Sequence, residues 1–338
     1  MLNKFNRSFI IAEIGNNHEG NFNLAKKMIS AAKKSGADAV KFQTIIPNLL
    51  VSIKDKKRIK QLKKFQFSFD QFKKLSDHAK KEKIIFLSTP TDLKSASFLN
   101  KIQNFFKISS GDNNYFPLIK KIASFNKSII LSTGLADLNL ISKSKKIIFN
   151  EWRKKPKNKK KLILMHCVSS YPVQTEDANL LAIKTLRNKF KDCIIGYSDH
   201  TVGILASTIS ASYGAKVIEK HFTLNKNQSS FRDHKLSANP NEMRELVNNI
   251  RCLENMRGDG NKKLEKGEKG SIKYMRRSAV ALRDLKKGEK LTSKNVKWLR
   301  SKEGVKIGQI HKIFKSKTLK KIKKDNIIKN NFLTPKIY

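Results

Sequence analysis

One pattern recurs along the first 257 residues: a short apolar, β-branched run, then a polar loop, then an amphipathic segment of helical period. The first unit is the run at 9–15, the loop at 16–20 and a helix expected over 23–35. An open doubly wound sheet could also hold such units, but no Gly-x-Gly-x-x-Gly loop follows the first run. Eight runs in about 240 residues match the number and size of a (β/α)8 barrel, so we predict an α/β TIM barrel over 1–257. The runs are 9–15, 39–43, 84–88, 105–108, 128–132, 162–167, 193–200 and 217–221.

The pattern changes after residue 257. Residues 258–274 are polar, glycine-containing and charged, which is typical of a linker. Residues 275–338 then carry short apolar runs separated by turns, at 278–283, 285–291 and 310–319. A tail of this length cannot bury a deep core alone, so we predict a small second domain that docks onto a barrel.

Polar side chains interrupt the apolar pattern where each run ends. In a TIM barrel these carboxyl ends of the strands carry the chemistry. Lysines buried there need an anion to compensate them, so Lys41 and Lys107, with nearby hydroxyls, indicate a phosphate or carboxylate ligand. The alternative is that a single lysine extends past the apolar wall to water. The residues are Glu13, Lys41, Gln43, Ser88, Lys107, Ser110, Asp112, Ser132, Thr133, His166, Ser198, Asp199, His200 and His221.

Two of these runs end in histidine. His200 and His221 are separated by one predicted helix, so neighbouring parallel strands would bring them side by side. A lone histidine near a strand end is more often a hydrogen-bonding residue than a metal ligand. Two converging imidazoles with carboxylates nearby, however, suit a divalent transition ion such as Mn, Fe, Co or Zn.

The formal charge of +45 comes from 72 basic and 27 acidic residues and requires a polyanion partner to be considered. The lysines, however, are spread over nearly every predicted helix, and no nucleic-acid-binding motif or aromatic cluster accompanies them. We therefore expect a solvated lysine surface and no specific nucleic-acid partner. A non-catalytic barrel that binds a polyanion remains an alternative from a different functional class.

Membrane insertion and export are not expected. No apolar run approaches the roughly 20 residues that span a bilayer, and the residues before the first strand do not resemble a targeting segment. Cys167, Cys193 and Cys252 show no paired or metal-type spacing. We therefore expect a reduced, cytoplasmic location.

Taken together, a series of motifs resembles the sialic acid (nonulosonate) synthases. The resemblance covers almost the whole chain, and its tail resembles the antifreeze-like (SAF, β-clip) domain that closes these enzymes. The motifs are Ala12-Glu-Ile-Gly-Asn-Asn-His-Glu-Gly20, Lys41-Phe-Gln-Thr, Ser88-Thr-Pro, Lys107-Ile-Ser-Ser-Gly-Asp-Asn-Asn, Leu131-Ser-Thr-Gly, His166-Cys-Val-Ser-Ser-Tyr-Pro, Gly196-Tyr-Ser-Asp-His-Thr, Glu219-Lys-His-Phe-Thr and, in the tail, Arg276-Arg-Ser-Ala-Val-Ala-Leu-Arg and Leu285-Lys-Lys-Gly-Glu-Lys-Leu-Thr.

The resemblance implies a role for each site residue. His200 and His221 would hold a divalent metal, typically Mn²⁺, with Mg²⁺ or Co²⁺ as alternatives. Asp112 stands where most members have glutamate, and would position the attacking water. Residues implied to bind phosphoenolpyruvate are Lys41, Lys107, Ser110, Ser132 and Ser198, with Ser169 where many members carry asparagine; those implied to contact the aminosugar or the reacting centre are Glu13, Gln43, Tyr171 and Asp233.

The same resemblance implies a domain-swapped homodimer, in which Arg300 reaches the partner's sugar site. Here Arg300-Ser-Lys-Glu-Gly304 replaces the usual Arg-Pro-Gly. The implied reaction joins phosphoenolpyruvate, an N-acylated aminosugar of the N-acetylmannosamine type and water, giving a sialic acid and phosphate. One alternative is a legionaminic or pseudaminic acid synthase acting on a 2,4-diacetamido hexose. Another is a barrel aldolase acting on a sugar phosphate, which would release no phosphate.

Overall fold

The computed structural model describes residues 7–156, 160–231 and 233–335. They divide into two compact units, Met1–Gly258 and Asp259–Tyr338. No helix among the described residues combines the length and the apolar character that a membrane crossing needs. Each unit is described by itself below.

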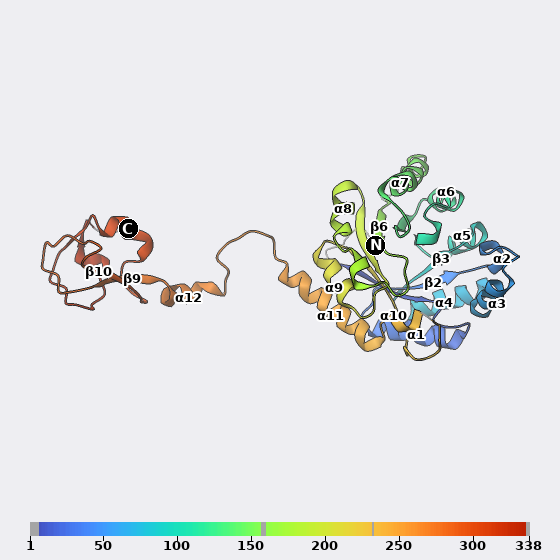
Figure 1. Cartoon of the computed structure of the whole chain (residues 1–338), viewed down its shortest axis with the longest axis horizontal. Coiled ribbons are helices and arrows are strands. Elements are labelled where there is room, and N and C mark those ends of the chain that lie inside the picture. The colour runs from blue at the N-terminus through green and yellow to red at the C-terminus, as the bar shows by residue number, and fades with distance from the viewer. Residues whose placement is uncertain (1–6, 157–159, 232, 336–338) are drawn as a thin grey trace. The chain divides into compact units, whose positions relative to one another are not determined.

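The first unit is a parallel eight-stranded barrel surrounded by helices (Figure 1), as predicted. The strand order is β3-β2-β1-β8-β7-β6-β5-β4. Between β3 and β4 the side chain of Gln103 bonds both backbone groups of Ser88, at 2.8 and 3.1 Å. The strands are β1 Phe9–Gly15, β2 Ala39–Thr44, β3 Ile85–Pro90, β4 Phe105–Ile108, β5 Ser128–Ser132, β6 Leu162–Cys167, β7 Ile194–Asp199 and β8 Val217–His221.

Helices cover the outside of the strands, and their ends follow local sequence signals. Asn21 caps α1, and α4 and α11 begin with capping boxes at Ser68 and Asn239. Gly36 ends the α1 turn with φ of 88°, a conformation that favours glycine. The helices are α1 Phe22–Lys34, α2 Pro47–Leu50, α3 Lys56–Phe65, α4 Phe69–Lys81, α5 Leu93–Leu99, α6 Phe116–Ser124, α7 Leu138–Arg153, α8 Ala182–Lys189, α9 Leu205–Ser212, α10 Asp233–Leu236 and α11 Pro240–Met256, with short 3₁₀ turns η1 Ser110–Asp112 and η2 Thr175–Ala178.

The period of two along each strand separates two cores. Ile10, Ala12 and Ile14 of β1 face the helices and join the large outer core. Ile11 instead belongs to a small cluster with Val217 and Ile130 from other strands, which we assign to the barrel interior. Because side chains alternate, the next inward residue after Ile11 is Glu13. The apolar layer therefore forms the floor on which the polar residues near the strand ends lie.

The second unit has its own core, formed by residues such as Ala279, Leu291 and Ile328. The segment 258–274, predicted as linker, includes most of an exposed helix, Glu268–Met275. One expectation for this part of the chain was wrong. The run at 310–319 begins as a helical turn, because its apolar residues Ile310 and Ile313 have helical spacing. The elements are α12 Glu268–Met275, β9 Arg277–Ala281, β10 Val296–Arg300, η3 Ile307–Gln309, α13 Ile310–Ile313, β11 Lys317–Thr318, η4 Asn330–Phe332 and β12 Leu333–Thr334.

Candidate active site

Four charged side chains meet inside the barrel, directly above its apolar floor. Lys41 Nζ lies 2.8 Å from Glu13 Oε1 and 3.6 Å from Glu219 Oε2, and Lys107 Nζ lies 3.2 Å from Glu219 Oε1. All four residues are at most 3% exposed. We call Glu13, Lys41, Lys107 and Glu219 the charge cluster. Its two lysines are therefore compensated by protein carboxylates, whereas the sequence argument had assigned that role to a ligand.

Glu219 was not among the predicted site residues, although a signal for it was present. It lies two positions before His221 on one strand, so both side chains point to the same face. Glu219 Oε1 also accepts a hydrogen bond from Ser198 Oγ at 2.9 Å. One buried carboxylate therefore contacts three of the residues expected to bind an anion: Lys41, Lys107 and Ser198.

The two carboxylates of the charge cluster differ in acidity. Burial raises the pKa of Glu13 to about 7, against the attraction of Lys41. Burial also opposes ionisation of Glu219, but the two lysines lower its pKa to about 2. Burial lowers the pKa of Lys107, whereas for Lys41 the two carboxylates outweigh burial and raise the pKa. Near pH 7, Glu219 is thus the permanent anion and Glu13 the group that exchanges a proton.

Two hydroxyls, those of Ser110 and Ser169, converge beside Gly134, which follows β5 and lies two residues after Ser132. A β-carbon at Gly134 would lie 2.4 Å from Ser169 Oγ and 2.7 Å from Ser110 Oγ, so a side chain there would displace both serine hydroxyls. The buried hydroxyls of Ser169 and Ser132 have no hydrogen-bond partner among the described residues. We call Ser110, Ser132 and Ser169 the serine cluster. Buried hydroxyls without a hydrogen-bond partner are donors available to an anion.

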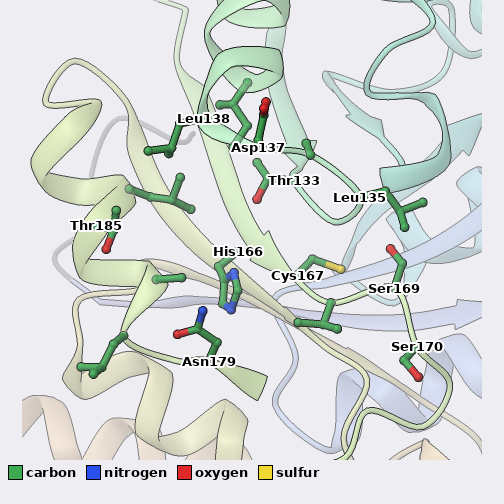
Figure 2. Close-up of a pocket in the computed structure, with 16 residues that line it drawn as sticks. Thr133, Leu135, Asp137, Leu138, His166, Cys167, Ser169, Ser170, Asn179 and Thr185 are labelled. Carbon is green, nitrogen blue, oxygen red and sulfur yellow. The ribbon is translucent and has the colours of Figure 1, made fainter. Parts of the chain in front are cut away.

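Ser169 of the serine cluster lines a cavity of about 650 Å³, whose wall also includes residues of α7 and α8. Figure 2 shows His166 in the middle of its wall, with Cys167 and Ser169 on one side and Thr185 on the other. His166 Nε2 lies 2.9 Å from the carbonyl oxygen of Ala178. This contact places His166 in a structural role at the base of the loop after β6.

His200 and His221 lie side by side as predicted, with ring centroids 5.3 Å apart. His200 Nδ1 lies 2.8 Å from the carbonyl oxygen of Val168, a contact that favours the proton on Nδ1 and the lone pair on Nε2. His221 Nδ1 is buried without a hydrogen-bond partner among the described residues, and Asp233 Oδ2 is 3.9 Å away. Two imidazoles with free nitrogens fit a divalent transition metal.

The protonation of the two histidines differs. Burial and the neighbouring His200 lower the pKa of His221 well below its usual range, which keeps the ring neutral. Burial also acts to lower the pKa of His200, but its contacts with Cys167 and Val168 raise the pKa overall. No group of three or more His, Cys, Asp or Glu side chains with metal-binding geometry occurs in the described part of the chain. Further ligands would therefore come from water or substrate.

A second, polar cavity of about 700 Å³ opens beside His221. Its wall includes Gln43, Tyr171 and Asp233, three of the residues expected to contact a sugar. Tyr171 packs on His200 with ring centroids 4.2 Å apart, and Gln43 Nε2 donates to Glu13 Oε1 at 3.3 Å. The remaining wall comes from the β1–α1 loop, from α3 and from the loop after β8: Asn16, Glu19, Arg58, Gln61, Leu62, Lys64, Phe65, Ser229, Ser230 and Phe231.

Two predicted site residues are less closely tied to this centre. Asp112 lies in η1, where it accepts a hydrogen bond from Ser109 Oγ at 2.6 Å, and burial raises its pKa. Arg300 is an exposed residue at the end of β10 in the second unit, paired in register with Arg277. The barrel strands thus bring Glu13, Lys41, Lys107, Ser198 and His221 together. Asp199 of β7 instead faces away from the barrel interior, and the role of Arg300 stays a prediction.

Comparisons with known proteins concern the whole chain and its fold. The profile of the NeuB family matches residues 28–262. The N,N'-diacetyllegionaminic acid synthase of Campylobacter jejuni is 40% identical over 337 residues, 96% of this chain and 99% of that one. The human N-acetylneuraminate-9-phosphate synthase is 34% identical over 84% of this chain and 80% of its own. The crystal structure of N-acetylneuraminic acid synthetase from Leptospira borgpetersenii, in complex with citrate, superposes with a TM-score of 0.73 at 35% identity, over 80% of this chain and 92% of that chain.

Proposed function

Because this chain belongs to the NeuB family, we propose that it is a nonulosonic acid synthase. It would condense phosphoenolpyruvate with an N-acylated aminosugar and water, giving a sialic acid and phosphate. One observation carries this proposal. His221 is paired in strand register with Glu13 of the charge cluster and also lines the polar cavity. The two imidazoles would therefore lie between the proposed anion site and the polar cavity proposed for the sugar.

Phosphoenolpyruvate would bind at the charge cluster and the serine cluster. Lys41 and Lys107 supply positive charge, and the unsatisfied hydroxyls of Ser132 and Ser169 supply donors. Ser110 and Ser198 complete the set of donors proposed for this anion. Because the lysines are already held by Glu13 and Glu219, binding would exchange partners within a preorganised set rather than order flexible chains.

His200 and His221 would hold the divalent metal, with Mn²⁺ preferred and Mg²⁺ or Co²⁺ as alternatives. A bound cation of this kind supplies Lewis acidity toward the aldehyde oxygen of the open-chain sugar. The protein's own contribution is to orient the two rings. Val168 fixes the tautomer of His200, and burial keeps His221 neutral.

The proposed chemistry forms one bond between carbons. C3 of phosphoenolpyruvate attacks the aldehyde carbon, and C2 develops positive charge that water then captures. Water adds its oxygen to C2 and loses a proton; as this tetrahedral adduct collapses to the C2 carbonyl, the bond between C2 and the bridging oxygen breaks and phosphate leaves with that oxygen. Ionised Glu13 would stabilise the charge at C2 or orient the water, and Asp112 is the second candidate for that task. Gln43, Tyr171 and Asp233 would hold the sugar.

Two classes of acceptor sugar are candidates, and sequence identity with a relative favours one of them. The resemblance of the motifs implies an acceptor of the N-acetylmannosamine type. The 40% identity with the Campylobacter jejuni legionaminic acid synthase, over nearly both whole chains, favours a 2,4-diacetamido hexose. The loop after β8 and the α3 wall of the polar cavity would decide between them, since both border the space left for the substituents of the sugar.

We propose a role in the sugar site for the second unit as well. The second unit would have the antifreeze-like fold, and in a domain-swapped homodimer Arg300 of one copy would reach the sugar site of the other. Arg300→Ala tests this in heterodimers with a chain whose barrel is inactive but whose Arg300 is intact. The barrel of the Arg300→Ala chain would receive Arg300 from its partner and stay active, so one of the two sites would work. Equal activity of Arg300→Ala and wild type would contradict the role of Arg300.

Phosphate release tests the function directly. Purified protein is incubated with Mn²⁺, phosphoenolpyruvate and each candidate sugar, and phosphate is measured against reactions without sugar. We expect sugar-dependent release from one candidate, abolished in His200→Ala and His221→Ala although both remain folded by circular dichroism. Full activity of the double histidine variant in chelator would defeat the metal assignment. Sugar condensation without phosphate release would instead indicate an aldolase.

A further inference from the structure

A buried ion pair lies directly behind the two histidines and has no part in the chemistry described above. Lys220 Nζ is 3.2 Å from Asp199 Oδ2, and the two side chains are 1% and 0% exposed. Asp199 precedes His200 and Lys220 precedes His221, and the two residues are partners in the β7–β8 ladder. The period of two turns them to the opposite face from Ser198 and Glu219, away from the barrel interior.

Asp199 and Lys220 form hydrogen bonds with three atoms of Thr201, the residue that follows His200. Asp199 Oδ1 accepts from Thr201 N at 2.9 Å and from Thr201 Oγ1 at 2.8 Å. Lys220 Nζ donates to the carbonyl oxygen of Thr201 at 2.6 Å. A helix joins the network through Ser207 of α9, whose Oγ donates to Asp199 Oδ2 at 2.5 Å. His200 is therefore fixed on both sides of its own backbone, partly by the residue next to His221.

Stability alone does not explain this arrangement. Buried ion pairs are often no better for stability than apolar residues of the same volume. What this pair provides is geometric: it joins the residue before one histidine to the residues on either side of the other. The distance between two metal-binding rings must be held within a few tenths of an ångström, and outer partners commonly provide that restraint.

We propose that Asp199 and Lys220 form a positioning pair that sets the spacing between His200 and His221. The inference rests on the metal site of the proposed function. Removal of the pair should therefore weaken Mn²⁺ binding while it leaves anion binding intact, because the charge cluster lies on the other face of the strands and shares no hydrogen bond with Asp199 or Lys220 in the described network.

The test measures Mn²⁺ and phosphoenolpyruvate affinity by calorimetry on the full-length chain. Asp199→Asn with Lys220→Met removes both charges at once and so avoids a lone buried charge. We expect this double variant to fold and to bind Mn²⁺ about 10- to 100-fold more weakly than wild type, with its metal-free affinity for phosphoenolpyruvate unchanged. Ser207→Ala removes one neutral donor to Asp199 and should weaken Mn²⁺ binding to a smaller extent.

Asp38→Asn is the matched control. Asp38 is also a partly buried carboxylate with several donors, Arg7, Arg251 and the amide of Ile10, but it precedes β2 at the amino-terminal end of the barrel. This variant should lose stability and keep the Mn²⁺ affinity of wild type. Equal loss of Mn²⁺ affinity in Asp38→Asn would show a general effect of destabilisation and overturn the inference.

The remaining outcomes separate the inference from the function on which it rests. If wild type binds Mn²⁺, His200→Ala does not, and the double variant binds as wild type does, the positioning role is wrong and the metal site stands. Loss of both ligands in the folded double variant also overturns the positioning role. If wild type binds no Mn²⁺, the metal site fails and the inference fails with it. Should the double variant not fold, unchanged Mn²⁺ affinity in Ser207→Ala overturns the inference.

Discussion

At the scale of single residues, the charge cluster shows what a sequence can and cannot reveal about a site. Lys41 and Lys107 were found from the sequence because a lysine interrupts an apolar strand visibly. Glu219 was missed because an acidic residue beside Lys220 resembles an ordinary surface pair in one dimension. Its partners are 112 and 178 residues away along the chain (Lys107 and Lys41), and only the closed ring of strands brings them together.

Glu13 predicts how the reaction depends on pH. With its pKa raised to about 7 by burial, the Glu13 carboxyl is protonated below that value and ionised above it. The proposed chemistry requires the ionised form, so kcat should rise with pH across neutrality. The measurement is a pH profile of phosphate release in wild type and in Glu13→Gln. The variant should be slow and lack this rise; a wild-type profile that falls between pH 6 and 8 would contradict the assignment.

Glu219 predicts a large effect on stability. Glu219→Gln leaves two buried ammonium groups facing one carboxylate, and breaking a buried ion pair in this way costs about 3–5 kcal/mol. Urea denaturation followed by circular dichroism measures the free energy of unfolding. Combining Glu219→Gln with Lys107→Met removes one charge of each sign and should recover much of the loss. A single variant as stable as wild type would show that Glu219 does not balance the lysines.

At the scale of elements, the barrel was more predictable than the tail. Eight apolar runs were confirmed as strands because parallel strands buried on both faces give continuous apolar stretches, which are easy to recognise. The second unit has two-residue strands and single helical turns, as at Lys317–Thr318 and Ile310–Ile313. Segments so short are determined by tertiary packing, and their own sequence pattern cannot distinguish helix from strand.

A substitution at Gly134 tests whether the loop after β5 contributes to phosphoenolpyruvate binding. In Gly134→Ala the added carbon would overlap the hydroxyls of Ser169 and Ser110. Overpacking of this kind costs about 1–3 kcal/mol, and the serine cluster would have to open. We expect weaker phosphoenolpyruvate binding in a folded protein, measured by calorimetry. The control is Gly111→Ala in the same end of the barrel, where the nearest side-chain atom lies 4.0 Å from the added carbon; equal affinities in the two variants would contradict the account.

At the scale of the whole molecule, charge and function have separate origins. The excess of 72 basic over 27 acidic residues comes from lysines throughout the chain, whereas the charge cluster has two cations and two anions and is buried. Solvent-exposed charges are screened by salt, and buried pairs much less. The high net charge therefore describes the surface and not the site.

The salt dependence distinguishes polyanion binding by the surface from catalysis at the buried site. Retention on heparin should fall steeply as salt increases, because polyanion binding depends on counterion release. Phosphate release at saturating phosphoenolpyruvate and sugar should change little over the same range. Turnover that disappears in parallel with heparin binding, or nucleic-acid binding that survives high salt, would favour the polyanion-binding alternative over the enzyme.

The central claim is that the two imidazoles share one metal ion beside the anion site. Crystals grown with Mn²⁺ and phosphoenolpyruvate, and measured at the manganese absorption edge, test it most directly. We predict a single anomalous peak within coordination distance of His200 and His221, with phosphoenolpyruvate on Lys41 and Lys107. A peak elsewhere, or phosphoenolpyruvate bound away from these lysines, would contradict the account.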